Sequence, residues 1–84
     1  MNREELAKVF ADRLNMIKND TDITYRDIER ATGIPHTSIG IWTHGKTLPN
    51  TYSLIRLAEY FGVTTDWLLG LSDEMGRSAW ASMI

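Results

Sequence analysis

Residues 24–46, TYRDIERATGIPHTSIGIWTHGK, decide the fold of this chain, because they predict two short helices joined by a tight turn. Thr24 is suited to cap the start of the first helix, and Asp27, three residues on, completes a capping-box-like pair. Gly33 allows the left-handed backbone at which this helix stops. The first helix is therefore only about nine residues long, which is too short to be stable alone.

The second helix of this pair is expected to begin at Pro35, whose fixed backbone angle suits a first turn, and to continue to His44, before Gly45. Its inward residues are Ile39 and Trp42. A second helix this close to the first must pack against it, so the pair depends on tertiary contacts.

The turn between the two helices is short and has an apolar residue of its own. Gly33 permits the sharp change of direction, and Ile34 can fill the angle between the helices, while Ile28 and Ala31 face inward from the first helix. This is the geometry of a helix-turn-helix, in which the second helix enters the major groove of DNA.

Three further helices are predicted around this pair. The first runs from about Arg3 to Lys18, with apolar residues at helical spacing: Leu6, Val9, Phe10, Leu14 and Ile17. The fourth begins after Asn50, a good N-cap, and closes at Gly62, with Leu54, Leu57, Ala58 and Phe61 on its inner face. The fifth is short, is capped at Thr64 or Thr65, has Asp66 in its first turn, and buries Leu68 and Leu69. The sequence therefore predicts a compact all-α bundle of five helices.

Composition limits the class of protein. The 84 residues, 43% of them hydrophobic and 24% charged, are enough for one modest core, so we expect one domain over residues 1–71 and a tail over residues 72–84. There is no cysteine, which removes disulfide frameworks, cysteine-bearing zinc sites and cysteine nucleophiles. No long apolar run or signal-peptide pattern occurs, so a cytoplasmic location is the expectation.

The charge is unevenly distributed along the chain. The formal net charge of −2 and the pI of about 5.5 argue mildly against nucleic acid as a partner. Residues 23–56, however, hold four basic residues against two acidic ones. An acidic chain can therefore present a weakly basic face.

The whole run from Ile23 to Gly70 resembles the Cro and phage-repressor (XRE-like) family of helix-turn-helix regulators. The matching pieces are the helix pair described above, HGK at its end, RLAEYFGV in the fourth helix and DWLLG in the fifth. The resemblance covers about residues 6–71, and the order and spacing of the pieces make it specific. It implies a lambda-repressor-like fold that binds double-stranded DNA, with no cofactor.

Three positions depart from the usual pattern of that family. Tyr25 stands where a glutamine is common, and could still reach a phosphate through its hydroxyl. Glu29 replaces an alanine close to the helix crossing, so we expect it to be partly exposed and paired with a neighbouring basic residue. Pro35 replaces the serine or threonine that usually caps the second helix, so one polar contact is lost.

Position in the family pattern assigns His36, Thr37, Gly40 and Ile41 to base contact. The face of the helix opposite Ile39 and Trp42 adds Ser38 and His44 to these candidates. The candidates for contact with the DNA backbone are Thr24, Tyr25, Arg26, Lys46, Thr47, Asn50 and Tyr52. A helical glycine costs about 1 kcal/mol relative to alanine. A close approach of DNA to Gly40 would offset that cost, and so would close packing against the preceding helix.

Other functions fit the sequence less well. No metal site is proposed, since the two histidines lack carboxylate partners at ligand spacing. Catalysis is not expected, because Asp27 and Glu29, two residues apart on a helix, face apart. A protein-interaction module on the same fold, such as an antitoxin or antirepressor, remains an alternative, since the second helix of the pair has no arginine or amide side chain.

The tail, SDEMGRSAWASMI, leaves several possibilities open. Residues 70–76 resemble a turn or linker, and Trp80, Met83 and Ile84 are apolar. They could fold back on the core, pair two subunits or begin a linker. Because repressors of this family bind palindromic sites as two-fold dimers, we expect the fifth helix and the tail to contribute to a homodimer contact.

Overall fold

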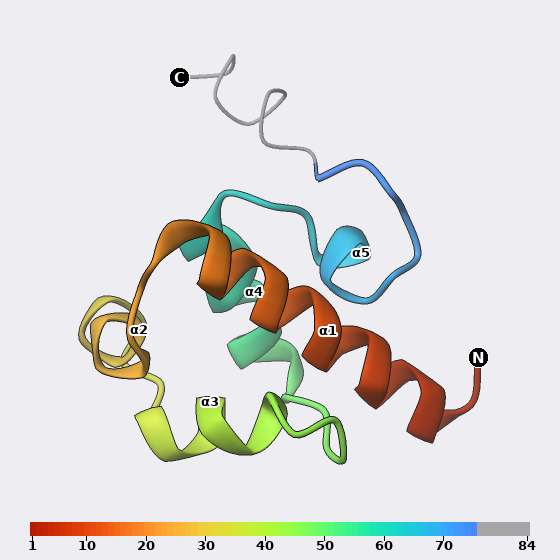
Figure 1. Ribbon diagram of the computed structural model, residues 1–84, viewed down its shortest axis with the longest axis horizontal. Coiled ribbons are helices and arrows are strands. Elements are labelled where there is room, and N and C mark those ends of the chain that lie inside the picture. The colour runs from red at the N-terminus through yellow and green to blue at the C-terminus, as the bar shows by residue number, and fades with distance from the viewer. Residues whose placement is uncertain (76–84) are drawn as a thin grey trace.

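The computed structural model describes residues 1–75, which form five helices and no strand (Figure 1). In chain order the helices are α1 (Arg3–Thr21), α2 (Tyr25–Thr32), α3 (His36–Trp42), α4 (Thr51–Phe61) and α5 (Thr65–Leu68). α1 crosses the middle of the molecule and packs against α3 along one edge and against α5 toward the other. The expected all-α, five-helix architecture is confirmed. Within residues 1–75, no helix has the length and hydropathy needed to cross a bilayer.

The caps that begin α2, α4 and α5 are ones that the sequence predicts. The Thr24 hydroxyl accepts the Asp27 N–H and the Asp27 carboxylate accepts the Thr24 N–H, both at 3.1 Å. These bonds hold the pKa of Asp27 below its usual value, because they favour the ionised carboxylate. Asn50 caps α4 and Thr64 caps α5 in the same way, through a side-chain oxygen. Local hydrogen bonding therefore sets where α2, α4 and α5 begin.

The first helix is longer than the sequence predicts. It continues past Lys18 to Thr21, whose hydroxyl donates to the Ile17 carbonyl at 2.8 Å. Asp22 then takes a left-handed backbone conformation (φ 56°), and its N–H closes the helix on Asn19. Aspartate tolerates this conformation better than most residues, so it does the work that glycine does at the ends of α2 and α4.

The core gathers one apolar side chain or more from every helix. The largest fully buried side chains are Phe10, Leu14 and Ile17 of α1, Ile28 of α2, Ile39 of α3, Leu57 of α4, Leu68 of α5, and Val63. Trp42 packs edge-on against Phe10, with ring centroids 6.4 Å apart. The core thus joins α3 to the longest helix of the fold.

Some predicted inward residues are not buried. Ala31 is exposed, and its neighbour Thr32 is buried in its place with its hydroxyl donating to the Ile28 carbonyl at 2.7 Å. Leu54 and Leu69 are only partly buried. In helices this short, one residue of error in the periodicity moves the predicted face by about 100°.

The third helix is also shorter than expected. Pro35 is its N-cap and has no side-chain capping bond, while Thr43 is its C-cap. If the helix continued, the Gly40 carbonyl would accept a hydrogen bond from the His44 N–H. It instead accepts hydrogen bonds from the Thr43 hydroxyl at 2.6 Å and from the His44 ring nitrogen Nδ1 at 2.7 Å. The His44 N–H bonds to Ile41 instead, which ends the helix.

The segment after α5 lies against the domain as far as the structure describes it. An ion pair of 3.3 Å joins Arg13 Nη2 to Asp73 Oδ1, and the Thr64 N–H donates to the Met75 carbonyl at 2.8 Å. At Gly70, where φ is +73°, a Cβ atom would overlap Val9 Cγ1. α5 and α1 therefore approach closely only because residue 70 has no side chain.

Replacing Gly70 tests this close approach, with Gly62 as a matched control. Gly62 has a similar backbone (φ +70°) but open space around it. We expect Gly62→Ala to lower the free energy of unfolding by about 1–2 kcal/mol, the cost of a left-handed non-glycine residue. Gly70→Ala should cost roughly 1–3 kcal/mol more, since it also overpacks Val9. Urea unfolding measures both variants.

A further variant separates overlap from backbone strain. In the Gly70→Ala background, Val9→Ala should destabilise less than it does in the wild-type chain, because the smaller side chain relieves the overlap. Equal losses for Gly62→Ala and Gly70→Ala would contradict the close approach.

Candidate nucleic-acid interface

The turn between α2 and α3 is held by buried hydrogen bonds. Gly33 has the left-handed backbone (φ 79°) that ends α2, and Ile34 is buried behind it. The Ile34 N–H donates to the Thr32 hydroxyl at 3.1 Å, while that hydroxyl donates to Ile28. Thr32 therefore satisfies its own polar group and fixes the direction in which the chain enters α3.

Glu29 fixes the start of α3 from the neighbouring helix. Its carboxylate oxygen Oε1 lies 3.2 Å from the His36 backbone nitrogen and 2.6 Å from the His36 ring nitrogen Nδ1. The side chain is 41% exposed. These two bonds to His36 lower the pKa of Glu29, the side-chain bond most. Glu29 is thus partly exposed and paired with the basic residue His36. Its carboxylate also makes the side-chain capping bond that Pro35, the N-cap of α3, cannot make.

Tyr25 and Asn15 fix the other end of α3. The Tyr25 hydroxyl lies 3.1 Å from the Thr43 hydroxyl, which donates its own hydrogen to Gly40. Tyr25 must therefore be the donor to Thr43. The Asn15 amide donates to the Thr43 carbonyl at 3.1 Å, and Lys18 Nζ lies 4.8 Å from the centre of the Tyr25 ring. A phosphate contact from the Tyr25 hydroxyl as donor would cost the bond to Thr43.

The outward face of α3 lies at the edge of the molecule (Figure 1). Ile39 and Trp42 point into the core, whereas Thr37 and Ile41 are exposed, Ile41 at 54%. His44 is exposed just beyond the end of the helix. The half-buried candidates are His36, Ser38 and Gly40. The structure therefore brings Thr37, Ile41 and His44 onto one outer face and places His36 and Ser38 at its sides.

The space around Gly40 bears on why it is a glycine. A Cβ atom there would lie 3.6 Å from Cε2 of Tyr25, which is ordinary van der Waals contact. Tyr25 of α2 is therefore the nearest neighbour, but its packing leaves room for a methyl group. Packing against α2 does not require a glycine at this position.

The candidates for contact with the DNA backbone lie on both sides of α3. Thr24 caps α2 by accepting a hydrogen bond, so its hydroxyl hydrogen remains available. Asn50 caps α4 through Oδ1 and keeps its amide group. These side chains are exposed: Thr24, Arg26, Lys46, Thr47, Asn50 and Tyr52, whereas Tyr25 is half-buried.

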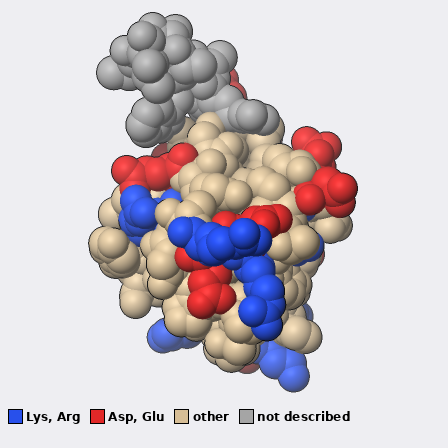
Figure 2. Space-filling view, turned by 90° about the vertical axis from the view of Figure 1, so that its left-hand side faces the viewer, with Lys and Arg blue, Asp and Glu red and all other residues tan. Residues whose placement is uncertain are grey.

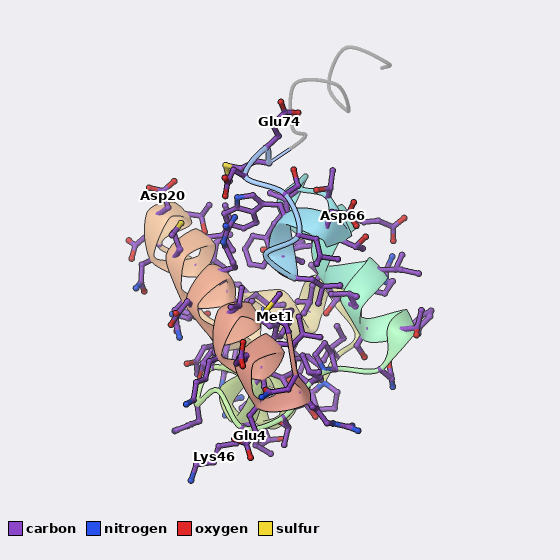
Figure 3. The ribbon with its side chains drawn as sticks, turned by 90° about the vertical axis from the view of Figure 1, so that its right-hand side faces the viewer. Met1, Glu4, Asp20, Lys46, Asp66 and Glu74 are labelled. Carbon is purple, nitrogen blue, oxygen red and sulfur yellow. The ribbon has the colours of Figure 1, made fainter. Side chains whose placement is uncertain are left out.

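Charged side chains are unevenly distributed between the two ends of the molecule. In Figure 3, Lys46 extends from the end at which α3 lies, while Asp20, Asp66 and Glu74 lie at or toward the opposite end, with Glu4 as an exception near Lys46. Figure 2 looks onto the side of α2 and shows basic and acidic side chains next to one another there. A shallow open depression on the surface is lined by Arg26, Glu29 and Arg30.

Two polar residues that contribute to this surface were not singled out from the sequence. Thr43 links Tyr25, Asn15 and Gly40, and Arg56 of α4 donates to the Ala31 carbonyl at the end of α2 at 3.4 Å. A hydroxyl in the last turn of a short helix was the available signal for Thr43. Nothing in the sequence indicates the Arg56 contact, which joins residues 25 positions apart. Within residues 1–75, no group of histidine, aspartate and glutamate side chains is arranged to hold a metal ion.

Comparison with known proteins agrees with this geometry. Residues 17–68, which extend from the end of α1 to α5, match the model of a helix-turn-helix family. No curated protein and no solved structure matches the chain.

Replacing Gly40 separates the two explanations for a glycine at this position, which are close approach of DNA and close packing against α2. Because the site has room for a methyl group, we expect Gly40→Ala to raise the free energy of unfolding by about 0.5–1 kcal/mol, the gain in helix propensity. Thermal and urea unfolding measure this. A loss of stability would show that the packing of Tyr25 does require glycine, whereas a stabilised variant with weakened DNA binding would support close approach of DNA.

Proposed function

The chain belongs to the Cro/C1-type (XRE) helix-turn-helix family of DNA-binding domains, which are not enzymes, and we propose that it is a bacterial or phage transcriptional repressor. In this proposal it acts in the cytoplasm or nucleoid and binds a palindromic operator as a homodimer. α3 enters the major groove of each half-site, and the half-sites lie about 34 Å apart.

The outward face of α3 is the observation that carries this proposal. Ile39 and Trp42 hold the helix in the core, while Thr37 and Ile41 are exposed. The major groove is about 12 Å wide and admits a helix. In the groove the Thr37 hydroxyl or methyl group contacts a base edge, and the Ile41 side chain packs on a thymine methyl group.

Contacts with phosphates set the register of α3 in the groove. Arg26 and Thr24 lie at the start of α2, and Lys46 and Thr47 follow α3. Asn50 and Tyr52 lie at the start of α4, whose free N–H groups favour phosphate. Tyr25 contributes only if its hydroxyl leaves Thr43 or accepts a hydrogen bond.

A protein-binding role for α3 is the second candidate. The observations that favour it are the 54% exposure of Ile41 and the absence of arginine, lysine, asparagine and glutamine from α3. Salt separates the two roles: for DNA binding, the logarithm of the association constant falls linearly with the logarithm of the salt concentration, in proportion to the phosphates contacted.

Thr37→Ala tests the reading role of α3. The operator is first selected from a random double-stranded DNA library with the wild-type chain. We then expect Thr37→Ala to weaken binding to that operator by about 1–3 kcal/mol, because a base contact is lost, and to weaken binding to random DNA much less. Equal losses on both DNAs would show that Thr37 does not read sequence. Thr21→Ala is the matched control, since its hydroxyl bonds only within α1.

The dimer is tested by removing residues 77–84, which lie outside the described residues and include Trp80, Met83 and Ile84. We expect the full chain to associate at a lower concentration than the shortened chain in sedimentation equilibrium, since these apolar residues and α5 contribute to the contact. Identical self-association of both chains would contradict a role for residues 77–84.

A further inference from the structure

The histidines at the two ends of α3, His36 in its first turn and His44 just after it, direct the same ring nitrogen at an oxygen that cannot donate. His36 Nδ1 lies 2.6 Å from Glu29 Oε1, and His44 Nδ1 lies 2.7 Å from the Gly40 carbonyl oxygen. A backbone carbonyl accepts only, and so does an ionised carboxylate. The lowered pKa of Glu29 keeps its carboxylate ionised at neutral pH. Nδ1 must therefore carry the hydrogen in both rings.

The position of that hydrogen determines what each ring offers to a partner. A neutral imidazole has one N–H group, so a hydrogen on Nδ1 leaves Nε2 with a lone pair that accepts. Neither Nε2 atom takes part in a hydrogen bond among the described residues. The His36 side chain is 36% exposed, and His44 is exposed. Both Nε2 atoms are thus available as acceptors.

We propose that His36 and His44, as neutral imidazoles, are acceptors that select an amino group of a base in the major groove. This inference rests on the proposed function, in which α3 reads DNA. Adenine N6 and cytosine N4 are the only amino groups that bases present in that groove. Guanine and thymine present oxygen or nitrogen acceptors, which repel the Nε2 lone pair. Each histidine therefore selects adenine or cytosine over guanine or thymine at the base that it faces.

The two histidines matter for base selection because α3 lacks the side chains that usually read bases. The helix has no arginine or lysine to donate to guanine, and no asparagine or glutamine to pair with adenine. Its other outward groups are hydroxyls, which serve as donor or acceptor, and apolar groups. In the neutral rings, the two Nε2 nitrogens are therefore the side-chain groups of α3 and its C-terminal end that accept a hydrogen bond without donating one.

Glu29 is a positioning residue in this scheme, and acts on one histidine only. It holds the His36 ring and has no contact with His44, whose partner is the backbone of α3. Replacing Glu29 should therefore change the behaviour of His36 and leave His44 as an internal control. Glu29→Ala should fold, because the position is half-exposed within α2 and alanine favours helix.

The conservative variant Glu29→Gln separates the acceptor from the charge. The His36 N–H and the ring Nδ1–H both point at the same oxygen, so the glutamine amide should place its carbonyl oxygen there. The variant removes the negative charge but keeps the acceptor. It should therefore retain the Nδ1–H form of His36.

Nitrogen-15 NMR of the free chain at pH 8 tests the ring forms without DNA. Long-range ¹⁵N–¹H spectra distinguish a protonated from an unprotonated ring nitrogen. We expect Nδ1–H in both histidines of the wild-type chain and of Glu29→Gln. In Glu29→Ala, His36 should become a mixture of the two forms while His44 stays unchanged. An Nε2–H form in the wild-type chain would overturn the proposal.

Selection from a random double-stranded DNA library at pH 8 tests the reading. The wild-type chain should enrich adenine or cytosine by about 3-fold to 10-fold at two positions of each half-site, the range of one net hydrogen bond. His36→Ala should abolish the preference at one of them and His44→Ala at the other. Glu29→Ala should weaken only the His36 position, and Glu29→Gln should retain both.

The possible failures are distinguishable. An enriched motif that prefers guanine or thymine at the histidine-dependent positions, or that does not respond to either histidine, would overturn the inference and leave the proposed function standing. The absence of any enriched sequence with the wild-type chain would overturn the proposed function, and the reading role of the histidines with it.

Discussion

A helix of seven residues is not stable alone in water, and the recognition surface that we propose for this protein is built on such a helix. α3 is stable only because Ile39 and Trp42 are buried and because Trp42 packs against Phe10 of α1. Burying two such side chains contributes several kcal/mol, roughly 1.5–3 for each. The packing of the core therefore positions α3, and the direction of each of its outward side chains depends on that packing.

Burial fixes the depth and rotation of α3, but polar contacts fix its two ends. Glu29 of α2 binds the first residue of the helix, and at the other end Asn15 of α1 and Tyr25 of α2 bind Thr43. Each of these contacts joins α3 to a helix that is itself in the core. The outward face is thus held before any partner arrives, so a partner does not have to order it.

The parts of this structure that sequence predicts are the parts decided locally. Thr24, Asn50 and Gly33 act over two to four residues, so their roles could be identified from spacing alone. Ala31 and Thr32 could not be told apart, because an eight-residue helix offers too few repeats to locate its inner face. The pairing of Glu29 with a basic residue was expected from its position, but the identity of that residue, His36, was not. Which residue Glu29 meets depends on the angle between α2 and α3, which only the packed core sets. For the same reason, the sequence suggested that the Tyr25 hydroxyl could reach a phosphate but not that it lies within hydrogen-bond distance of Thr43.

The separation of charge along the molecule has a consequence for how it meets a polyanion. Among the side chains labelled in Figure 3, Lys46 and Glu4 lie at the end of the molecule where α3 lies, and Asp20, Asp66 and Glu74 lie toward the opposite end. These five groups place their net negative charge away from α3 and so contribute a dipole, in addition to the formal net charge of −2 of the chain. In the field of a phosphate backbone a dipole experiences a torque. A molecule that approaches with its acidic end first is repelled and rotated, whereas one that approaches with α3 first is attracted within about a Debye length. The small negative net charge slows the approach to DNA from a distance. At close range the dipole favours orientations in which α3 faces the DNA, so a larger fraction of encounters brings α3 into contact with it.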